Sequence, residues 1–195
     1  LSWTYKIQSD GFISGRLGEG EIVMAYFPLF VDLEGRTVLL IGGGAVASRR
    51  AASLSDFGCS IMVISPELHQ NLQEMEKSGR IIWKRKAYEA SDLTAGKRPF
   101  FVLAAGPEHV NQQVTADCKR LGIPVNDASQ KENCDFYFPG LVKDGEAVIG
   151  ITSGGGDHKL AAALSALVRE FMRTRREKEN SSGRIDESSG GRAGL

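Results

Sequence analysis

Residues 38–50 read VLLIGGGAVASRR, and this stretch decides the fold. Its first four residues are apolar and suit a buried strand, three consecutive glycines follow, and the next residues read as a helix. Because glycine has no side chain, the backbone of such a turn can come very close to another group.

The glycines match the pattern G-x-G-x-x-A at Gly42, Gly44 and Ala47. In this pattern the first glycine permits a tight turn, the second lets a diphosphate approach the backbone, and the small third residue lets helix and strand pack closely. The N–H groups around Ala45 and Val46, at the start of the helix, then face the anion. We therefore expect a dinucleotide site, and the alternative is a glycine-rich turn without a ligand.

Short apolar strands continue to alternate with amphipathic helices as far as residue 126. The expected strands are Thr37–Ile41, Ser60–Ser65, Ile81–Arg85, Phe100–Ala105 and Pro124–Asn126, and the expected helices are Ala45–Phe57, Leu68–Lys77 and Glu108–Leu121. This alternation predicts an α/β protein with a Rossmann-like, doubly wound parallel sheet, covered by helices on both faces.

The alternation of strands and helices ends near residue 135. FYFPGLV and EAVIGIT read as two strands without an intervening helix, and Lys159–Arg173 reads as a helix with an apolar stripe. We expect residues 24–135 to form an NAD-binding Rossmann domain and residues 136–176 a small β/α region for dimerisation. Residues 177–195 are polar and rich in Ser and Gly, and are expected to be disordered. Residues 1–23 are expected to be a leader or an artefact of start assignment, or alternatively an added edge strand.

Composition narrows the possible functions. The 195 residues include 24 basic and 24 acidic side chains, and this zero net charge argues against a nucleic-acid partner. The three cysteines form no C-x-x-C pair, which favours free thiols in a reducing cytoplasm. The three histidines are scattered, so spacing predicts no metal site. Neither a membrane span nor a secretory signal is recognisable, so no membrane partner is expected.

The end of the second strand bears on the choice of cofactor. An acidic residue there usually binds the ribose hydroxyls of NAD, whereas an arginine accommodates the additional phosphate of NADP. The sequence has Pro66 and then Glu67, slightly beyond the usual place, and no arginine at the strand end. NAD is therefore the expected cofactor.

Several segments together resemble a known family. In order they are YFPLFVDLEGRTVLLIGGGAVASRR, VISPEL, FFVLAAGPEHVNQQV, PVNDASQKENCDFYFPGLV and ITSGG. This chain resembles the precorrin-2 dehydrogenases, also known as the siroheme synthase N-terminal domain family, over about residues 25–170. The resemblance implies a homodimer with exchanged elements and NAD-dependent oxidation of the tetrapyrrole precorrin-2 to sirohydrochlorin in siroheme biosynthesis. Some members of the family also insert ferrous iron.

The resemblance also implies the cofactor contacts. Ala105 and Gly106 would lie near the nicotinamide. With the glycine bend and the end of the second strand, the expected cofactor-binding residues are Gly42, Gly43, Gly44, Ala45, Val46, Ser65, Pro66, Glu67, Ala105 and Gly106.

A catalytic aspartate is expected in the segment after the fifth strand. Aligning the FP of CDFYFP places Ser129 at the family's aspartate, whereas Asp127 lies two residues earlier. The catalytic acid is therefore either Asp127 in a shifted loop or absent, and both Asp127 and Ser129 are candidates. A carboxylate at the carboxyl edge of the sheet could accept the substrate proton. The alternative role for Asp127 is a turn residue that bonds its own backbone.

Asn126, Ser153 and His158 are the candidate substrate contacts. The family has Ser-Pro where this chain has Asp157 and His158, so Asp157 is expected to cap the next helix and His158 could instead be a solvent-facing residue of its first turn. Cationic partners for the substrate carboxylates could come from a set that sequence does not rank, namely Arg49, Arg50, Lys143, Lys159 and Arg169. Two other functions stay open: a non-catalytic dinucleotide- or tetrapyrrole-binding protein, and an NAD-linked oxidoreductase with another substrate.

Overall fold

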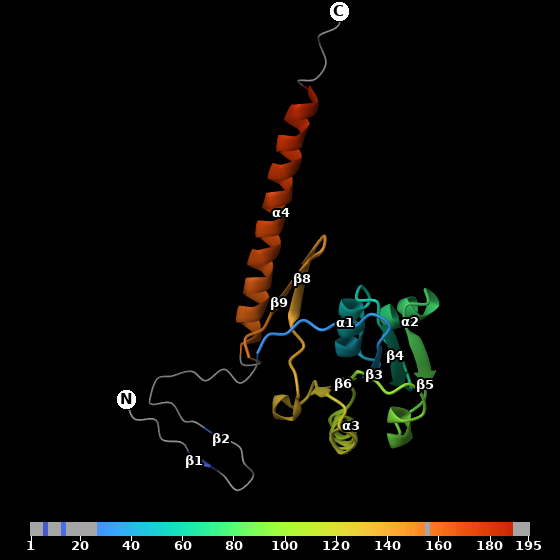
Figure 1. Cartoon of the computed structure of the whole chain (residues 1–195). Coiled ribbons are helices and arrows are strands. Elements are labelled where there is room, and N and C mark those ends of the chain that lie inside the picture. The colour runs from blue at the N-terminus through green and yellow to red at the C-terminus, as the bar shows by residue number, and fades with distance from the viewer. Residues whose placement is uncertain (1–5, 8–12, 15–26, 155–156, 189–195) are drawn as a thin grey trace, which may run out of the picture.

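The computed structural model describes residues 6–7, 13–14, 27–154 and 157–188. Five parallel strands form one sheet in the order β5-β4-β3-β6-β7 (Figure 1). The strands are β3 (Thr37–Ile41), β4 (Ser60–Ser65), β5 (Ile82–Arg85), β6 (Phe101–Ala104) and β7 (Val125–Asp127). The chain adds strands first on one side of β3 and then on the other, which creates a switch point between β3 and β6. The predicted Rossmann-like doubly wound sheet is confirmed.

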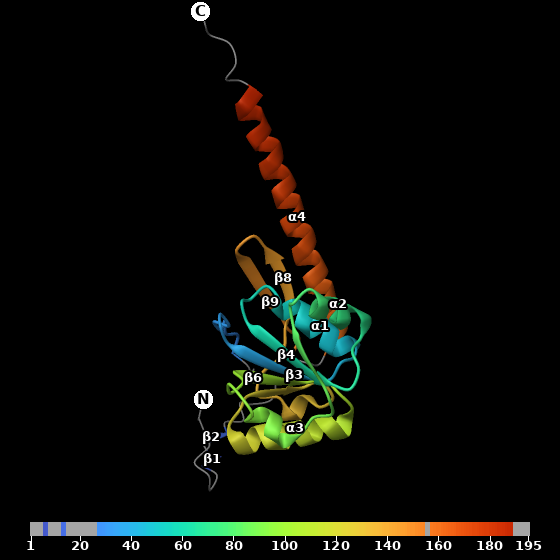
Figure 2. The ribbon, with the colours of Figure 1, turned by 90° about the vertical axis from the view of Figure 1, so that its right-hand side faces the viewer.

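Helices cover both faces of this sheet (Figure 2). Helices α1 (Ala45–Leu54) and α2 (Gln70–Lys77) pack on one face, and α3 (Glu108–Leu121) packs on the other together with the short 3-10 helix η1 (Ala90–Leu93). Alternate side chains of β3 pack on opposite faces of the sheet. Val38 and Leu40 belong to the core on the α1 side, and Leu39 and Ile41 belong to the core on the α3 side. Burial on both faces explains why β3 is apolar throughout.

The remaining elements form an appendage to the sheet. Strands β8 (Gly140–Asp144) and β9 (Ala147–Ile151) make an antiparallel hairpin, against which the long helix α4 (His158–Ser188) packs. Ser165 is buried against Gly140, and Arg169 donates a hydrogen bond to the Leu141 carbonyl. Figures 1 and 2 show α4 projecting away from the Rossmann domain. Although α4 is long, neither it nor another helix in the described part is apolar enough to cross a bilayer.

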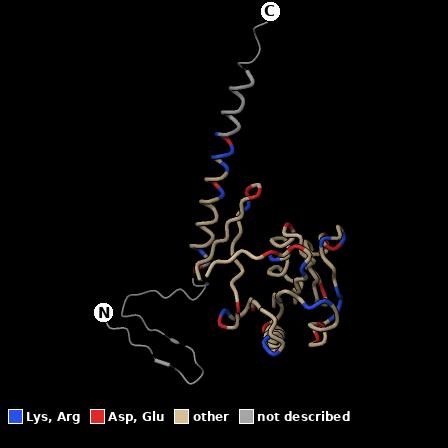
Figure 3. The backbone as a smooth tube through the Cα atoms, in the orientation of Figure 1, with Lys and Arg blue, Asp and Glu red and all other residues tan. Residues whose placement is uncertain are grey.

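Disorder was expected from residue 177, whereas α4 continues as far as Ser188. Charged residues of both signs follow one another along the coloured part of α4 that leads up to this extension (Figure 3). Arg173 pairs with Glu170 one turn before it and with Glu177 one turn after it, and such pairs favour helix in a polar sequence. Residues 189–195 lie outside the described residues.

An added edge strand was the alternative for the N-terminal segment, but the residues that the structure describes there pair with each other. Strand β1 (Lys6–Ile7) pairs with β2 (Ile13–Ser14) in a separate antiparallel hairpin and does not join the five-stranded sheet. The other residues of the 1–23 segment lie outside the described residues, so the expectation of a leader or an artefact stays a prediction.

The glycine bend between β3 and α1 is held by its neighbours on both sides. Gly42 has a φ of +118°, and a Cβ there would lie 2.4 Å from the Ala105 carbonyl oxygen. A Cβ on Gly43 would lie only 1.9 Å from the Glu67 carbonyl oxygen, whereas one on Gly44 would meet no heavy atom within 4 Å. The protein's own packing thus requires glycine at the first two positions but not at the third.

We predict that Gly43→Ala destabilises the fold by about 2 kcal/mol or more, because the Glu67 backbone has to move to admit the methyl group. Gly44→Ala is the matched control and should cost clearly less, about 1 kcal/mol or below, which is the ordinary preference of a helix N-cap for glycine over alanine. Urea unfolding followed by far-UV circular dichroism measures both, and equal stability of the two variants would contradict this account of the bend.

Candidate functional site

The start of α1 is open to an anion. Gly44 occupies the N-cap position without a side-chain hydrogen bond, and the first turn carries no acidic residue. The first N–H groups of a helix have no partners within it and bear a partial positive charge. Because glycine at position 44 is not required by neighbouring protein atoms, the open space there suits a diphosphate. Ala47 is fully buried, as the packing role of the third small residue requires. These residues fit the diphosphate of NAD.

The ends of β4 and β6 flank this bend. The Ser65 hydroxyl donates to the Glu67 carbonyl at 2.7 Å, so it shapes the loop after β4, while Pro66 and Glu67 are exposed at its rim. The Ala105 N–H donates to the Ile41 carbonyl, and the Gly106 N–H donates to Asn111 Oδ1 at 2.9 Å. The structure therefore gathers the predicted cofactor residues at one edge of the sheet, with Ser65 and the Gly106 N–H already engaged by the protein.

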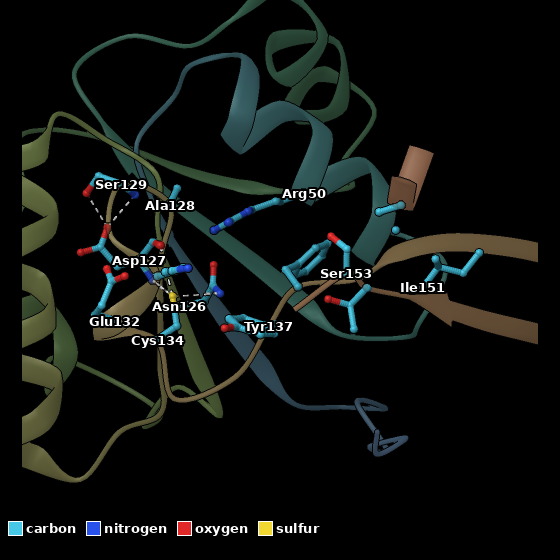
Figure 4. Close-up of a pocket in the computed structure, with 15 residues that line it drawn as sticks. Arg50, Asn126, Asp127, Ala128, Ser129, Glu132, Cys134, Tyr137, Ile151 and Ser153 are labelled. Carbon is cyan, nitrogen blue, oxygen red and sulfur yellow. Dashed lines mark hydrogen bonds between the residues drawn. The ribbon is translucent and has the colours of Figure 1, made fainter. Parts of the chain in front are cut away.

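A cavity of about 410 Å³ lies at the same carboxyl edge, between the Rossmann domain and the β8–β9 hairpin (Figure 4). Asn126, Asp127, Ser129 and Ser153 all line it, so four of the five predicted catalytic and substrate residues meet here. The fifth, His158, begins α4, and its side chain lies outside the described residues. Asp157 caps α4 as predicted, accepting a hydrogen bond from the Leu160 N–H at 2.9 Å.

Asp127 is almost fully buried, with 3% of its surface exposed. Its Oδ1 accepts hydrogen bonds from the Ser129 N–H at 2.8 Å, the Ser129 hydroxyl at 2.5 Å and the Gln130 N–H at 3.3 Å, and its Oδ2 accepts one from Asn133 at 3.3 Å. Burial opposes the charge, but these hydrogen bonds outweigh it, so the pKa of Asp127 lies below the ordinary value of an aspartate. The carboxylate is ionised at neutral pH.

The two candidate catalytic residues, Asp127 and Ser129, form one hydrogen-bonded unit. Ser129 both donates to Asp127 and accepts a hydrogen bond from Asn111 Nδ2 at 3.2 Å. Because Asn111 Oδ1 accepts the Gly106 N–H, a continuous chain of hydrogen bonds joins the end of β6 to the Asp127 carboxylate. Sequence reasoning missed Asn111. The available signal was an amide on the buried stripe of α3, which also includes Val114 and Cys118.

The segment after β7 folds back over the cavity. The Val125 N–H donates to the Asp135 carboxylate, and the Asp135 N–H donates to the Val125 carbonyl. Cys134, the residue before Asp135, contacts Asp127: its Sγ accepts a hydrogen bond from the Asp127 N–H at 3.2 Å. Burial raises the pKa of the Cys134 thiol, so it stays protonated at neutral pH. Within the described ranges, no group of three or more His, Cys, Asp or Glu side chains is arranged to hold a metal ion.

A doubly wound parallel sheet with a glycine bend and an uncapped helix start defines a dinucleotide-binding Rossmann domain. Comparison with known proteins agrees: the family model NAD_binding_7, described as NAD(P)-binding, matches residues 29–140. The chain belongs to this NAD(P)-binding family, and the predicted nicotinamide dinucleotide cofactor is thereby confirmed.

Relatives and solved structures point to one branch of this family. The siroheme synthase of Psychrobacter arcticus is 38% identical over 149 residues, which cover 76% of this chain and 27% of that protein. The siroheme synthase of Ectopseudomonas mendocina is 34% identical over 149 residues, covering 76% and 31%. The solved structure of SirC, precorrin-2 dehydrogenase, superposes with a TM-score of 0.60 at 26% identity, covering 74% of this chain and 70% of that one.

The resemblance to the siroheme synthase N-terminal family is confirmed by these likenesses. The chain spans less than a third of the length of the two siroheme synthases.

We predict that Gly44→Asp abolishes NAD binding without unfolding the protein. The new carboxylate would stand where the diphosphate approaches the helix start, and the Cβ has free space. Titration of NADH fluorescence should show affinity reduced by about 100-fold or more, since a charge and a steric conflict combine. Gly96→Asp is the control, because it adds the same charge at an equally open glycine before the amino end of β6. Unchanged NADH affinity in folded Gly44→Asp would contradict the site.

Proposed function

We propose that this chain oxidises precorrin-2 to sirohydrochlorin with NAD as the oxidant. The observation that carries the proposal is the connection between the predicted dinucleotide site and the cavity. The glycine bend and the ends of β4 and β6 suit the dinucleotide, and the Gly106–Asn111–Ser129–Asp127 chain leads from there into the cavity. The resemblance to siroheme synthases and to SirC, precorrin-2 dehydrogenase, supports this choice of substrate.

The roles of the residues follow from this geometry. NAD, when bound, supplies the acceptor for the hydride. The amides at the start of α1 hold the diphosphate, and Asn111 keeps the Gly106 end of β6 fixed relative to the cavity. Asp127 is the ionised carboxylate of the cavity that could accept the substrate proton, with the Ser129 hydroxyl hydrogen-bonded to it.

A binding protein without turnover is the second candidate function. Each oxygen of Asp127 already accepts a hydrogen bond from its own loop, and its lowered pKa makes it a weak base. This observation favours a structural role for Asp127. A turnover assay separates the two candidates.

We predict that the wild-type protein, mixed with precorrin-2 and NAD, develops the absorption spectrum of sirohydrochlorin, and that Asp127→Asn lowers the rate by about 100-fold or more. NADH affinity should stay unchanged in this variant because Asp127 lies outside the glycine bend. Absence of turnover in the wild type would favour the binding protein, and full turnover of Asp127→Asn would exclude Asp127 as the base.

The pH dependence of the same assay tests the charge state of Asp127. Because the pKa of Asp127 lies below the ordinary value of an aspartate, the base stays deprotonated on mild acidification. Asp127 should cause no loss of turnover until the pH falls below the range in which an ordinary aspartate titrates. Ser129→Ala removes the hydrogen bonds of the hydroxyl, so it should raise the pKa of Asp127 and move the acid limb of the pH–rate profile to higher pH.

Adding ferrous iron after turnover tests iron insertion, which stays a prediction.

We also propose that residues 136–176 mediate a homodimer. The support is an apolar stripe on α4 that the hairpin does not cover, and its members have between 40% and 67% of their surface exposed. They recur at helical spacing as Leu160, Leu164, Leu167 and Phe171. Large contiguous apolar patches on a protein surface mark interaction sites, and a second copy of this helix supplies a matching stripe.

We predict that Leu167→Glu converts the protein to a monomer in size-exclusion chromatography with light scattering, because it places a charge in the stripe. Ala166→Glu is the control, since it adds the same charge one residue away on an exposed side of α4 outside the stripe. A monomeric wild type, or a Leu167→Glu protein that dimerises as the wild type does, would contradict the proposal.

The expected cytoplasmic location likewise stays a proposal. It is supported by Cys59, Cys118 and Cys134, which form no disulfide bond and so suit a reducing compartment.

A further inference from the structure

Arg50 reaches from α1 into the cavity at the carboxyl edge of the sheet (Figure 4). Its guanidinium lies over the ring of Phe138, with 5.5 Å between Cζ and the ring centroid. The Nη1 atom is buried and has no hydrogen-bond partner among the described residues. Burial lowers the pKa of Arg50 to about 10, so the side chain keeps its charge at neutral pH at a cost in desolvation.

Asn126 presents the complementary group in the same cavity. The residue is buried, with 4% of its surface exposed, and its Nδ2 donates to the Phe136 carbonyl at 2.7 Å. That bond fixes the orientation of the side-chain amide. The Phe136 carbonyl oxygen is an acceptor, so the atom facing it has to be the donor Nδ2 and not the acceptor Oδ1. Oδ1 is therefore the free end, and it has no donor in the described part of the chain.

Asp127 does not provide the missing partner for Arg50. The nearby Cys134 and Asp127 both act to raise the pKa of Arg50 against the larger effect of burial, but no hydrogen bond or ion pair joins Arg50 to Asp127, whose oxygens accept from Ser129, Gln130 and Asn133. A buried donor or acceptor without a partner costs about 1–3 kcal/mol, and more when it is charged. An unpaired cationic donor and an unpaired acceptor among the residues that line one cavity therefore destabilise the protein unless a ligand satisfies both.

We infer that Arg50 and Asn126 form a substrate subsite, in which Arg50 binds a peripheral carboxylate of the tetrapyrrole and Asn126 Oδ1 accepts one of its N–H groups. This inference rests on the proposed function, and it identifies the recognition of the substrate within that site. A guanidinium is the side chain best suited to hold a carboxylate by paired hydrogen bonds. A tetrapyrrole with carboxylate side chains offers both complementary groups.

The structure also ranks the five cationic candidates that sequence left equal. Arg49 is exposed, Lys143 pairs with Asp56, and Arg169 donates to the Leu141 carbonyl. Lys159 is exposed near the start of α4. Arg50 is the candidate that lines the cavity.

The test is equilibrium binding of sirohydrochlorin, followed by its absorption, with NADH binding measured in parallel. Arg50→Gln should weaken the affinity for sirohydrochlorin by about 10–100-fold, the size expected for losing a buried charged hydrogen bond. Its affinity for NADH should stay within about twofold, because Arg50 lies outside the glycine bend. Arg49→Gln removes the same charge from the neighbouring, exposed position and should bind both ligands as the wild type does.

Two further measurements separate recognition from a structural role. Arg50→Lys keeps the charge but loses the paired hydrogen bonds, so its affinity for sirohydrochlorin should fall between those of the wild type and Arg50→Gln. Without ligand, Arg50→Gln should melt at the same temperature as the wild type or higher, since it relieves an unpaired buried charge. A lower melting temperature accompanied by weakened binding of both ligands would assign Arg50 to the fold and overturn the inference.

The outcomes distinguish the inference from the proposed function. Equal affinity of the wild type and Arg50→Gln for sirohydrochlorin would overturn the subsite while leaving the proposed function intact. Failure of the wild type to bind sirohydrochlorin, with normal NADH binding, would overturn the proposed function and the subsite together.

Discussion

The rest of the structure depends on the close approach of three backbone segments at the end of β3. Gly42 lies against the backbone of Ala105, and Gly43 lies against the backbone of Glu67. Both contacts are so close that there is no room for a Cβ on either glycine. This contact brings the ends of β3, β4 and β6 to one place and sets the direction in which α1 leaves the sheet. The open start of α1 and the position of Arg50 in its second turn are consequences of that direction.

The polar side chains at the carboxyl edge divide into a satisfied set and an unsatisfied set. Asp127, Ser129 and Asn111 satisfy one another, and this keeps a buried carboxylate ionised and its loop in one conformation. Arg50 Nη1 and Asn126 Oδ1 have no partners in the described part of the protein. Native proteins rarely leave buried polar atoms unpaired, and for this reason we propose that a ligand completes the unsatisfied set, while the satisfied set holds the site in shape.

Much of the fold could be predicted because local patterns and tertiary packing agree. Thr37–Ile41, Ser60–Ser65 and Glu108–Leu121 have the boundaries expected from their apolar patterns and from turn residues such as Gly122, which adopts the left-handed conformation. The extension of α4 to Ser188 could not be predicted from composition, because a polar segment rich in Ser and Gly is typical of disorder, whereas the charge pairs around Arg173 favour helix. Asn111 was missed because nothing local distinguishes a functional amide from a tolerated one on a helix.

The strand–glycine–helix turn, the parallel sheet and the edge at which ligands are expected could all be predicted from sequence, because each follows from the spacing of residues along a short segment of chain. The tertiary structure decided that Asp127 and Ser129 act as one unit, and that Arg50 rather than Arg49 faces the cavity. It also decided that Gly43 is required by packing while Gly44 is left open. These facts depend on distances between segments far apart in the chain, and on which polar atoms remain unpaired after folding, and neither quantity is encoded in local spacing.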